Sequence, residues 1–335
     1  MIGISTKGAI GAALLLASLC GAALAQGQER RYTIGTNPPG TLYHTVGSGF
    51  AKVLQEKLGK QTTVQPGAGS STYLPLVENR EVTLGIASSL DSGGAYRGEQ
   101  GREPMKKLRA VARLWPLSYG FMVRGDSGIQ SAADLKGKRV VTDIKANAAL
   151  AEANLAMLAT AGLTPSDVTP VSIGDLPQGV QGVVDGSIDA TSIALGIPLT
   201  KQANASAPGG IAYVDLGAKD ANEVLGEKLP GLYALQIKPN PAMPEVKKDL
   251  TVSGFDIFLV ASEDLSDADV TGIVKTLHEN WEGLQQDFPA LRPGKPEDFA
   301  AASNTVPYHP AAIAYFKSKG LWNDANEKRE ARLQR

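Results

Sequence analysis

The sequence has 335 residues, of which 43% are hydrophobic and 20% are charged, and its formal net charge is −1. These fractions are ordinary for a globular protein. A nearly neutral chain lacks the general positive field of nucleic-acid-binding proteins, so we expect no nucleic-acid partner. The length is large for a single hydrophobic core and favours two lobes.

The N-terminal segment has the organisation of a secretory signal peptide. Lys7 precedes the apolar stretch GAIGAALLLASLCGAAL, and ALA at 23–25 forms a small-residue cleavage site before Gln26. The alternative is a membrane anchor, but the apolar run is short for a bilayer core of about 30 Å. We therefore predict a cleaved signal peptide over residues 1–25 and a periplasmic mature protein. Cleavage removes Cys20, the single cysteine, and with it any disulfide or thiolate ligand.

Strand and helix signals alternate after residue 30, which predicts an α/β fold. Apolar and β-branched runs predict strands at 31–36, 62–66, 83–89, 139–143, 168–174, 190–196 and 254–262. Pro116 is expected to divide 108–129 into two further strands. Apolar residues at helical spacing predict helices at 42–59, 70–82, 147–163, 176–186 and 267–288, and the segment 309–322 ends the fold.

Two strand-rich passages, near 116–124 and 253–261, are the predicted crossovers between lobes. They divide the mature chain into lobe I, residues 31–117 plus 255–322, and lobe II, residues 118–254. The charged segment 323–335 is predicted to be a solvated, frayed tail.

Four passages, in order along the chain, resemble one known family. They are IGTNPPGTLYHTVG, VENREVTLGIASS, FMVRGDSGIQSAADLKGKRV and TVPYHPAAIAYFKSKGLW. They are similar to motifs of the TAXI-type solute-binding proteins of tripartite ATP-independent periplasmic (TRAP) transporters, and the likeness covers nearly the whole mature chain. It implies a type II periplasmic-binding-protein fold, with a ligand cleft between two lobes joined by crossover strands. It also implies delivery to small and large membrane subunits, which are often fused. We expect the binding protein to be a monomer.

The sequence departs from this family at three places expected to face the ligand. TDIKANAA replaces a glycine-serine-glycine-threonine loop, Ser88-Ser89-Leu90 replaces Q-S-D, and His44 replaces the second tyrosine of TYY. The identity of the ligand therefore cannot be transferred from a relative.

The opening segment, Tyr32 to Leu54, predicts a strand, a turn and a helix N-terminus. Unpaired backbone N–H groups at such a terminus favour a carboxylate or phosphate. Gly40 permits close approach of a ligand, while side chains nearby can form hydrogen bonds; the candidates are Thr36, Asn37, Thr41 and Tyr43. The segment has no Gly-Lys-Ser/Thr end, which a nucleotide phosphate loop requires. It also has no Gly-x-Ser-x-Gly, which a nucleophile elbow requires. A purely structural turn is the remaining alternative.

Five further residues are predicted ligand contacts. Ser88 and Ser89 end a strand, where ligands bind in open α/β sheets, but they can equally cap the next turn. Arg113 can clamp a carboxylate or pair with an acid. Asn147 stands near the start of a helix, and Ser192 ends another strand.

The favoured function is capture of a small organic anion by hinge closure; we consider a dicarboxylate, a keto acid or an acidic amino acid. No cofactor or metal is expected, because His44, His278 and His309 lack metal-ligand spacing. An exported sensor of the same fold is the main alternative. An exported hydrolase is a weaker one, since no nucleophile signature is visible.

Overall fold

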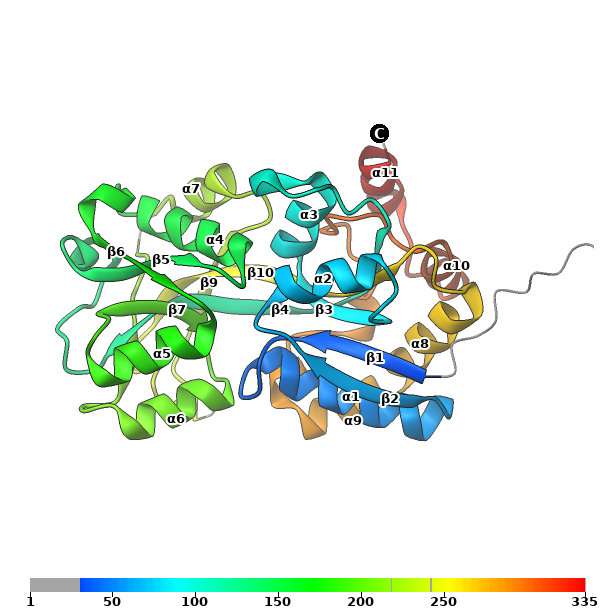
Figure 1. Ribbon diagram of the computed structural model, residues 1–335, viewed down its shortest axis with the longest axis horizontal. Helices are drawn as coiled ribbons and strands as arrows, with labels where there is room; N and C mark the ends of the chain where they lie inside the picture. The colour runs from blue at the N-terminus through cyan, green and yellow to red at the C-terminus, as the bar shows by residue number, and fades with distance from the viewer. Residues whose placement is uncertain (1–30, 218, 242, 335) are drawn as a thin grey trace, which may run out of the picture.

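The computed structural model describes residues 31–217, 219–241 and 243–334. The predicted signal peptide lies outside these residues. Within them, strands and helices alternate along the chain and form two lobes side by side (Figure 1).

One mixed sheet passes through both lobes. Its path is β2-β1-β3-β10-β4-β7-β5-β6, with β8 paired to β4 and β9 paired to β10. The strands are β1 Arg31–Thr36, β2 Gln61–Pro66, β3 Leu84–Ser88, β4 Leu108–Arg124, β5 Arg139–Ile144, β6 Thr169–Ile173, β7 Ala190–Ala194, β8 Ile211–Tyr213, β9 Tyr233–Ile237 and β10 Leu250–Ser262.

Helices cover both faces of the sheet in each lobe (Figure 1). They are α1 Leu42–Leu58, α2 Ser70–Glu78, α3 Ser89–Arg97, α4 Ala148–Ala159, α5 Leu176–Asp185, α6 Pro198–Ser206, α7 Ala221–Lys228, α8 Asp267–Glu279, α9 Trp281–Asp287, α10 Pro310–Ser318 and α11 Asp324–Leu333.

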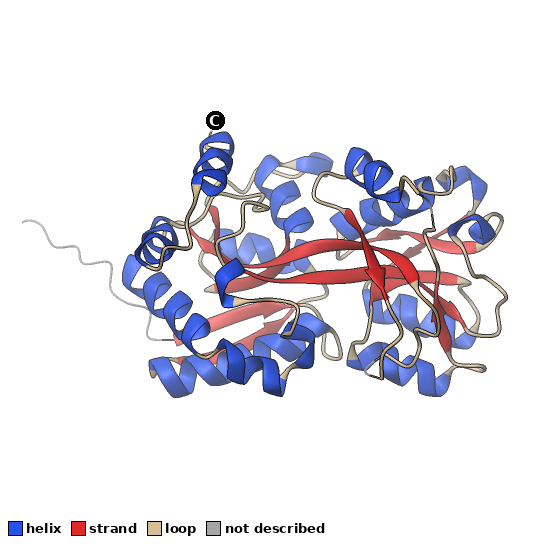
Figure 2. Ribbon diagram, turned by 180° about the vertical axis from the view of Figure 1, so that it is seen from behind, coloured by secondary structure: helices blue, strands red, loops and turns tan. Residues whose placement is uncertain are grey.

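The two longest strands, β4 and β10, connect the lobes. They pair antiparallel from Ser253↔Tyr119 to Ser262↔Leu108 and pass through the middle of both lobes (Figure 2). On one side β10 pairs with β3, and on the other β4 pairs with β7. This arrangement confirms the predicted two-lobe α/β fold. We keep the names lobe I and lobe II for the residue ranges given above.

The first helix is fixed closely against the first strand. Val46, Phe50 and Leu54 are fully buried on one face of α1, as its apolar period predicts. A side chain at Gly47 would bring a Cβ within 2.6 Å of Thr36, so glycine lets α1 approach the end of β1. Gly59 then ends the helix in the left-handed conformation. The packing holds the N-terminus of α1 at the strand end that faces lobe II.

The prediction of two strands around Pro116 is wrong, since β4 is continuous. Pro116 lies opposite Asp256 of β10, whereas pairing with β7 begins only at Tyr119. The missing N–H of Pro116 therefore falls where β4 has a ladder partner on one side only, and a proline is tolerated there.

Two predictions about the C-terminal region are also wrong. The helix expected over 267–288 is broken at Asn280, whose side-chain amide donates to the carbonyl oxygen of Thr276 at 2.8 Å. The segment expected to be a frayed tail contains α11, and Glu330 of this helix is 5% exposed and accepts a hydrogen bond from the Tyr308 N–H. The buried positions of α11 are polar, so its packing face lacks an apolar signature.

Candidate functional site

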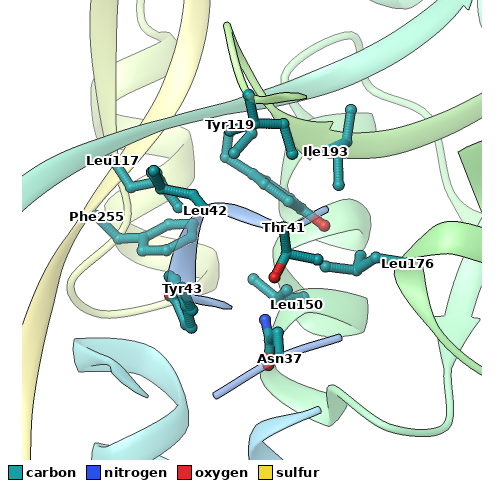
Figure 3. Close-up of a pocket in the computed structure, with 12 residues that line it drawn as sticks. Asn37, Thr41, Leu42, Tyr43, Leu117, Tyr119, Leu150, Leu176, Ile193 and Phe255 are labelled. Carbon is teal, nitrogen blue, oxygen red and sulfur yellow. The ribbon is translucent and has the colours of Figure 1, made fainter. Parts of the chain in front are cut away.

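A cavity lies between the lobes, where β1 meets α1 (Figure 3). Its free volume in this arrangement of the lobes is about 20 Å³, close to what one bound water requires. Lobe I contributes residues from the opening turn and the crossover strands, and lobe II contributes residues from four helices and strands. The lining residues are Asn37, Thr41, Leu42, Tyr43, Leu117, Tyr119, Leu150, Leu176, Ile193, Ala194, Ile197 and Phe255.

The polar end of this cavity is the opening turn. Gly40 has a φ of +86°, a conformation that favours glycine. Thr41 precedes the first residue of α1, but its hydroxyl donates to the carbonyl oxygen of Pro38 at 2.6 Å and caps no helix amide. The first turn of α1 also holds no acidic residue. Its backbone N–H groups thus have neither a capping side chain nor a local countercharge.

Asn37 is a buried amide with an unsatisfied atom. Its side chain is 4% exposed, and Oδ1 has no hydrogen-bond partner. Figure 3 shows the amide nitrogen on the side of Leu150 and the oxygen turned away. An unsatisfied buried polar atom costs about 1–3 kcal/mol. The amide nitrogen, on the side of the lining residue Leu150, is the group that can donate a hydrogen bond to a bound molecule.

Two tyrosines line the cavity from opposite lobes. Tyr43 packs edge-on against Trp115, with ring centroids 6.3 Å apart. The Tyr119 hydroxyl lies 2.6 Å from the Ser192 hydroxyl and also donates to Asn154 at 3.3 Å. Burial raises the pKa of both Tyr43 and Tyr119, so both hydroxyls stay protonated at neutral pH. Ser192 is fully buried and serves as a hydrogen-bond partner of Tyr119.

The lobes touch at two places beside the cavity. Asn147, at the start of α4, donates to the Ser70 hydroxyl at 3.0 Å, and the Ser71 N–H donates to the Ala146 carbonyl oxygen at 3.2 Å. The Leu199 N–H donates to the carbonyl oxygen of Gly40 at 3.2 Å. These contacts join lobe I to lobe II, so the structure is a closed arrangement.

Ser88 and Ser89 adopt the capping alternative. The Ser88 hydroxyl accepts from the Asp91 N–H at 2.8 Å and donates to the Asp91 carboxylate at 2.7 Å. The carbonyl oxygen of Ser89 accepts from Thr305. Neither serine is among the twelve lining residues.

Asp91 itself has no signal in the sequence. It is 1% exposed, and burial raises its pKa, while hydrogen bonds from Ser88 and Ser70 oppose the rise. After burial, which is the larger cause, its negative charge also contributes to the raised pKa of Tyr43 and of Tyr119, two residues of the cavity wall.

Arg113 is engaged in an ion pair inside lobe I. Its Nη2 lies 2.8 Å from Asp256 Oδ1, and its Nε lies 3.1 Å from the same oxygen. Asp256 also accepts hydrogen bonds from Tyr233 and Ser303. Arg113 is not among the lining residues, and none of those twelve residues is charged.

Two of the three histidines stand in structural positions. His309 is 1% exposed and begins α10, where its Nδ1 accepts from the Ala311 N–H. His278 packs edge-on against Phe299 and Tyr315. Over the described ranges, no three His, Cys, Asp or Glu side chains cluster as metal ligands would. In those same ranges, no helix combines the length and the apolar character needed to cross a membrane.

The sequence analysis missed most of the apolar lining. Leu117, Leu150, Leu176, Ile193 and Phe255 are all buried and look like core residues in the sequence. Only the pairing of β4 with β10 and the closure of the lobes bring them to one cavity. Tyr119 of β4 also lines the cavity, whereas Phe121, two residues further along the strand, belongs to the core.

Two lobes, two crossover strands and a cavity between the lobes define the periplasmic-binding-protein fold. The sequence pattern of the NMT1-like family matches residues 34–320, and the chain belongs to that family. The match covers both lobes.

Solved structures share this fold at low sequence identity. MatC from Rhodopseudomonas palustris, solved with bound malate, has a TM-score of 0.58 and 11% identity, covering 90% of this chain and 98% of that one. An amino acid ABC transporter substrate-binding protein from Streptococcus pneumoniae, bound to L-arginine, has a TM-score of 0.50, 12% identity and coverages of 79% and 95%. An ancestral arginine-binding protein has a TM-score of 0.51, 16% identity and coverages of 78% and 99%. At these identities the likeness defines the fold and leaves the ligand open.

Proposed function

We propose that this protein is an extracytoplasmic solute-binding protein that holds a small organic anion between its lobes. The observation that carries the proposal is the uncapped N-terminus of α1, whose first residues line a cavity formed by both lobes. The solute-binding proteins that share the fold support the same role.

The anionic character of the ligand follows from the first turn of α1. Free N–H groups at a helix N-terminus and the helix dipole favour a negative group. No acidic side chain lines the cavity to oppose it. We place the anionic group against the backbone of Leu42 and Tyr43, with Asn37 and Thr41 beside it. Thr36, Gly40 and Ser192 then shape or support this end of the site.

Hinge closure is the proposed mechanism. The ligand bridges lobe I and lobe II and shifts an open–closed equilibrium toward the closed form, because only that form offers it both walls. Asn147 reinforces closure through Ser70. The proposed role of three other residues is structural. They hold α3 and the crossover strands in place without contacting the ligand; they are Ser88, Ser89 and Arg113.

The closed form is proposed to deliver its ligand to TRAP membrane subunits, as a periplasmic monomer of the TAXI type. The four ordered sequence passages and the signal-peptide pattern support this partner and this compartment. The rival sensor function shares the fold and the binding step. Genes for membrane subunits next to this gene favour transport, and a receptor gene in their place favours sensing.

Binding is favoured over hydrolysis by the lining residues. Among these twelve there is no serine, cysteine, histidine or acid, and the one threonine hydroxyl donates to Pro38. A nucleophile with a base in reach is the minimum for seryl chemistry.

A thermal-shift screen of residues 26–335 tests the proposal. The library holds small carboxylates, phosphates, amino acids and sugars. A ligand at about 100 times its Kd adds about 2.7 kcal/mol of stability, which raises the unfolding midpoint by several degrees. Shifts confined to related anions are the expected result. If refolded, ligand-free protein responds to no anion, the proposal is wrong.

A further inference from the structure

We infer that Asn147 exchanges one hydrogen bond for another as the lobes move. In the closed form its side-chain nitrogen bonds to Ser70 of lobe I, and in the open form its side-chain oxygen caps its own helix, α4. The inference rests on the proposed hinge closure and deepens it, because it names a positioning residue that sets the balance between the two forms.

The start of α4 lacks the cap that its sequence provides. Asn147 is the residue before the helix, where asparagine is among the preferred capping residues, yet its side chain forms no cap. The first N–H groups bonded at this end are those of Leu150 and Ala151, which both donate to the Asn147 carbonyl oxygen at 3.1 Å. The N–H groups of Ala148 and Ala149 come before them and depend on a side-chain acceptor.

The oxygen that would supply this cap is unpartnered. Among the described residues, none donates a hydrogen bond to the buried Oδ1 of Asn147. Asn147 is 1% exposed and Ala149 is 3% exposed, so both are shielded from solvent. A buried acceptor and a buried donor at the same helix start are natural partners, and leaving both unpaired is costly.

Contacts with lobe I account for the missing cap. The side-chain nitrogen of Asn147 donates to the Ser70 hydroxyl at 3.0 Å. Its Oδ1 lies against Gly69, where an added Cβ would be only 2.2 Å from it. Because Ser70 and Gly69 both belong to lobe I, separation of the lobes removes both contacts. The side chain is then able to turn its oxygen toward the Ala149 N–H, which is the bond that an N-cap residue forms.

A second asparagine shows how this residue behaves at a helix start without an interlobe contact. Asn323 precedes α11, which lies on lobe I, away from lobe II (Figure 1). Its Oδ1 accepts from the N–H groups of Ala325 and Asn326 at 2.9 and 3.2 Å. Asn323 therefore caps its helix, whereas Asn147 is held away from the same bond.

Serine and alanine at position 147 separate the two bonds. Asn147→Ser keeps a good capping hydroxyl, but this hydroxyl is one bond nearer to Cβ than the amide nitrogen and is too short to reach Ser70. Asn147→Ala loses both bonds. We therefore expect serine to give the higher urea midpoint and alanine to give the higher fraction of closed molecules. A residue that only holds the lobes together predicts the same closed fraction for both variants.

Spin-label distance measurements on residues 26–335, with no solute added, give the closed fraction. These residues contain no cysteine. The exposed Lys52 of α1 and Lys201 of α6, each changed to cysteine, therefore provide one label in each lobe. The open-to-closed ratio should be at least about threefold higher in Asn147→Ser than in Asn147→Ala, since only serine stabilises the open form through the cap. Equal ratios, or a higher ratio in Asn147→Ala, overturn the inference.

The matched controls are Asn323→Ser and Asn323→Ala. Alanine should lower the urea midpoint more than serine does, and neither variant should change the open-to-closed ratio. If the labels report a single form in every protein, the urea midpoints decide, and equal midpoints for the two variants at position 147 contradict the cap. Because no solute is added, failure of every solute in the thermal-shift screen counts against the proposed function alone. Equal open-to-closed ratios count against the exchange at Asn147 and leave solute binding intact.

Discussion

Asn147 of lobe II donates its side-chain amide to the hydroxyl of Ser70 in lobe I, with an N···O distance of 3.0 Å. Both residues stand at helix starts, and the Ser71 N–H donates to the Ala146 carbonyl oxygen beside them. Gly69 makes this approach possible, because a Cβ there would collide with Ala146 and Asn147. The contact exists only while the lobes are closed, so it contributes to the closed state and not to the open one.

Asn147→Ala should therefore weaken ligand binding by favouring the open form. A net hydrogen bond contributes about 0.5–1.5 kcal/mol, which corresponds to a loss of roughly tenfold or less in affinity. Stopped-flow measurements should place the change in the dissociation rate. Asn222→Ala, which removes a hydrogen bond within lobe II, is the control. Equal dissociation rates for Asn147→Ala and the wild type would show that the contact does not govern closure.

Asn37→Ala should separate affinity from stability. Because Oδ1 of Asn37 has no hydrogen-bond partner, removal of the side chain should lower the unfolding free energy by less than about 1 kcal/mol, while the amide nitrogen is lost as a donor to the bound anion. Ligand affinity should nevertheless fall at least tenfold. Asn304 is a buried asparagine that donates to the Val306 carbonyl oxygen. Asn304→Ala should therefore lower the free energy of unfolding and leave ligand affinity unchanged. Urea unfolding and calorimetry on both variants make the comparison, and an unchanged affinity in Asn37→Ala contradicts the assignment.

Asp91→Asn should raise the affinity for carboxylates a few-fold at pH 7, because it removes a buried negative charge whose field reaches Tyr43 and Tyr119. Burial raises the pKa of Asp91 above 3.8. The wild type should therefore approach the affinity of the variant as the pH falls through that raised pKa, while the ligand remains ionised. Calorimetry from pH 7 to 5 measures the convergence. Glu330→Gln, a buried acid beside Tyr308, should leave affinity unchanged; a drop in affinity for Asp91→Asn would count against an anionic ligand.

His309 should make the fold sensitive to mild acid. Burial lowers its pKa below the ordinary value of 6.5, so the unfolded chain takes up this proton more readily than the folded one. The free energy of unfolding should fall as the pH drops through 6.5 toward the lowered pKa. His309→Gln should show a smaller loss between pH 7 and pH 5.5 in urea titrations. Parallel pH profiles for the two proteins would exclude His309 as the cause.

The sequence predicts the part of the site that is formed by one continuous segment, the turn between β1 and α1. Pro38, Pro39 and Gly40 mark the turn between β1 and α1 in the sequence. Of the residues selected there, Asn37, Thr41 and Tyr43 line the cavity, whereas Thr36 and Gly40 do not. The apolar wall is different, because Leu117 and Phe255 are distant in sequence and carry the pattern of core residues.

The roles of charged and hydroxyl residues are also hard to predict from the sequence. Arg113 and Ser88 have side chains suited to an anion, but their roles depend on partners. Asp256 is 143 residues from Arg113 in the chain, and the pair forms only because β4 and β10 lie side by side. The helix break at Asn280 and the polar packing face of α11 likewise depend on tertiary contacts that no local period records.

The central claim is that a small carboxylate binds between the lobes at the N-terminus of α1. The most direct test is a crystal structure of residues 26–335 grown with the tightest carboxylate from the binding screen. The account predicts that the carboxylate lies against the backbone N–H groups of Leu42 and Tyr43 beside Asn37. A ligand bound outside this cavity, or bound with its carboxylate away from this helix terminus, would contradict it.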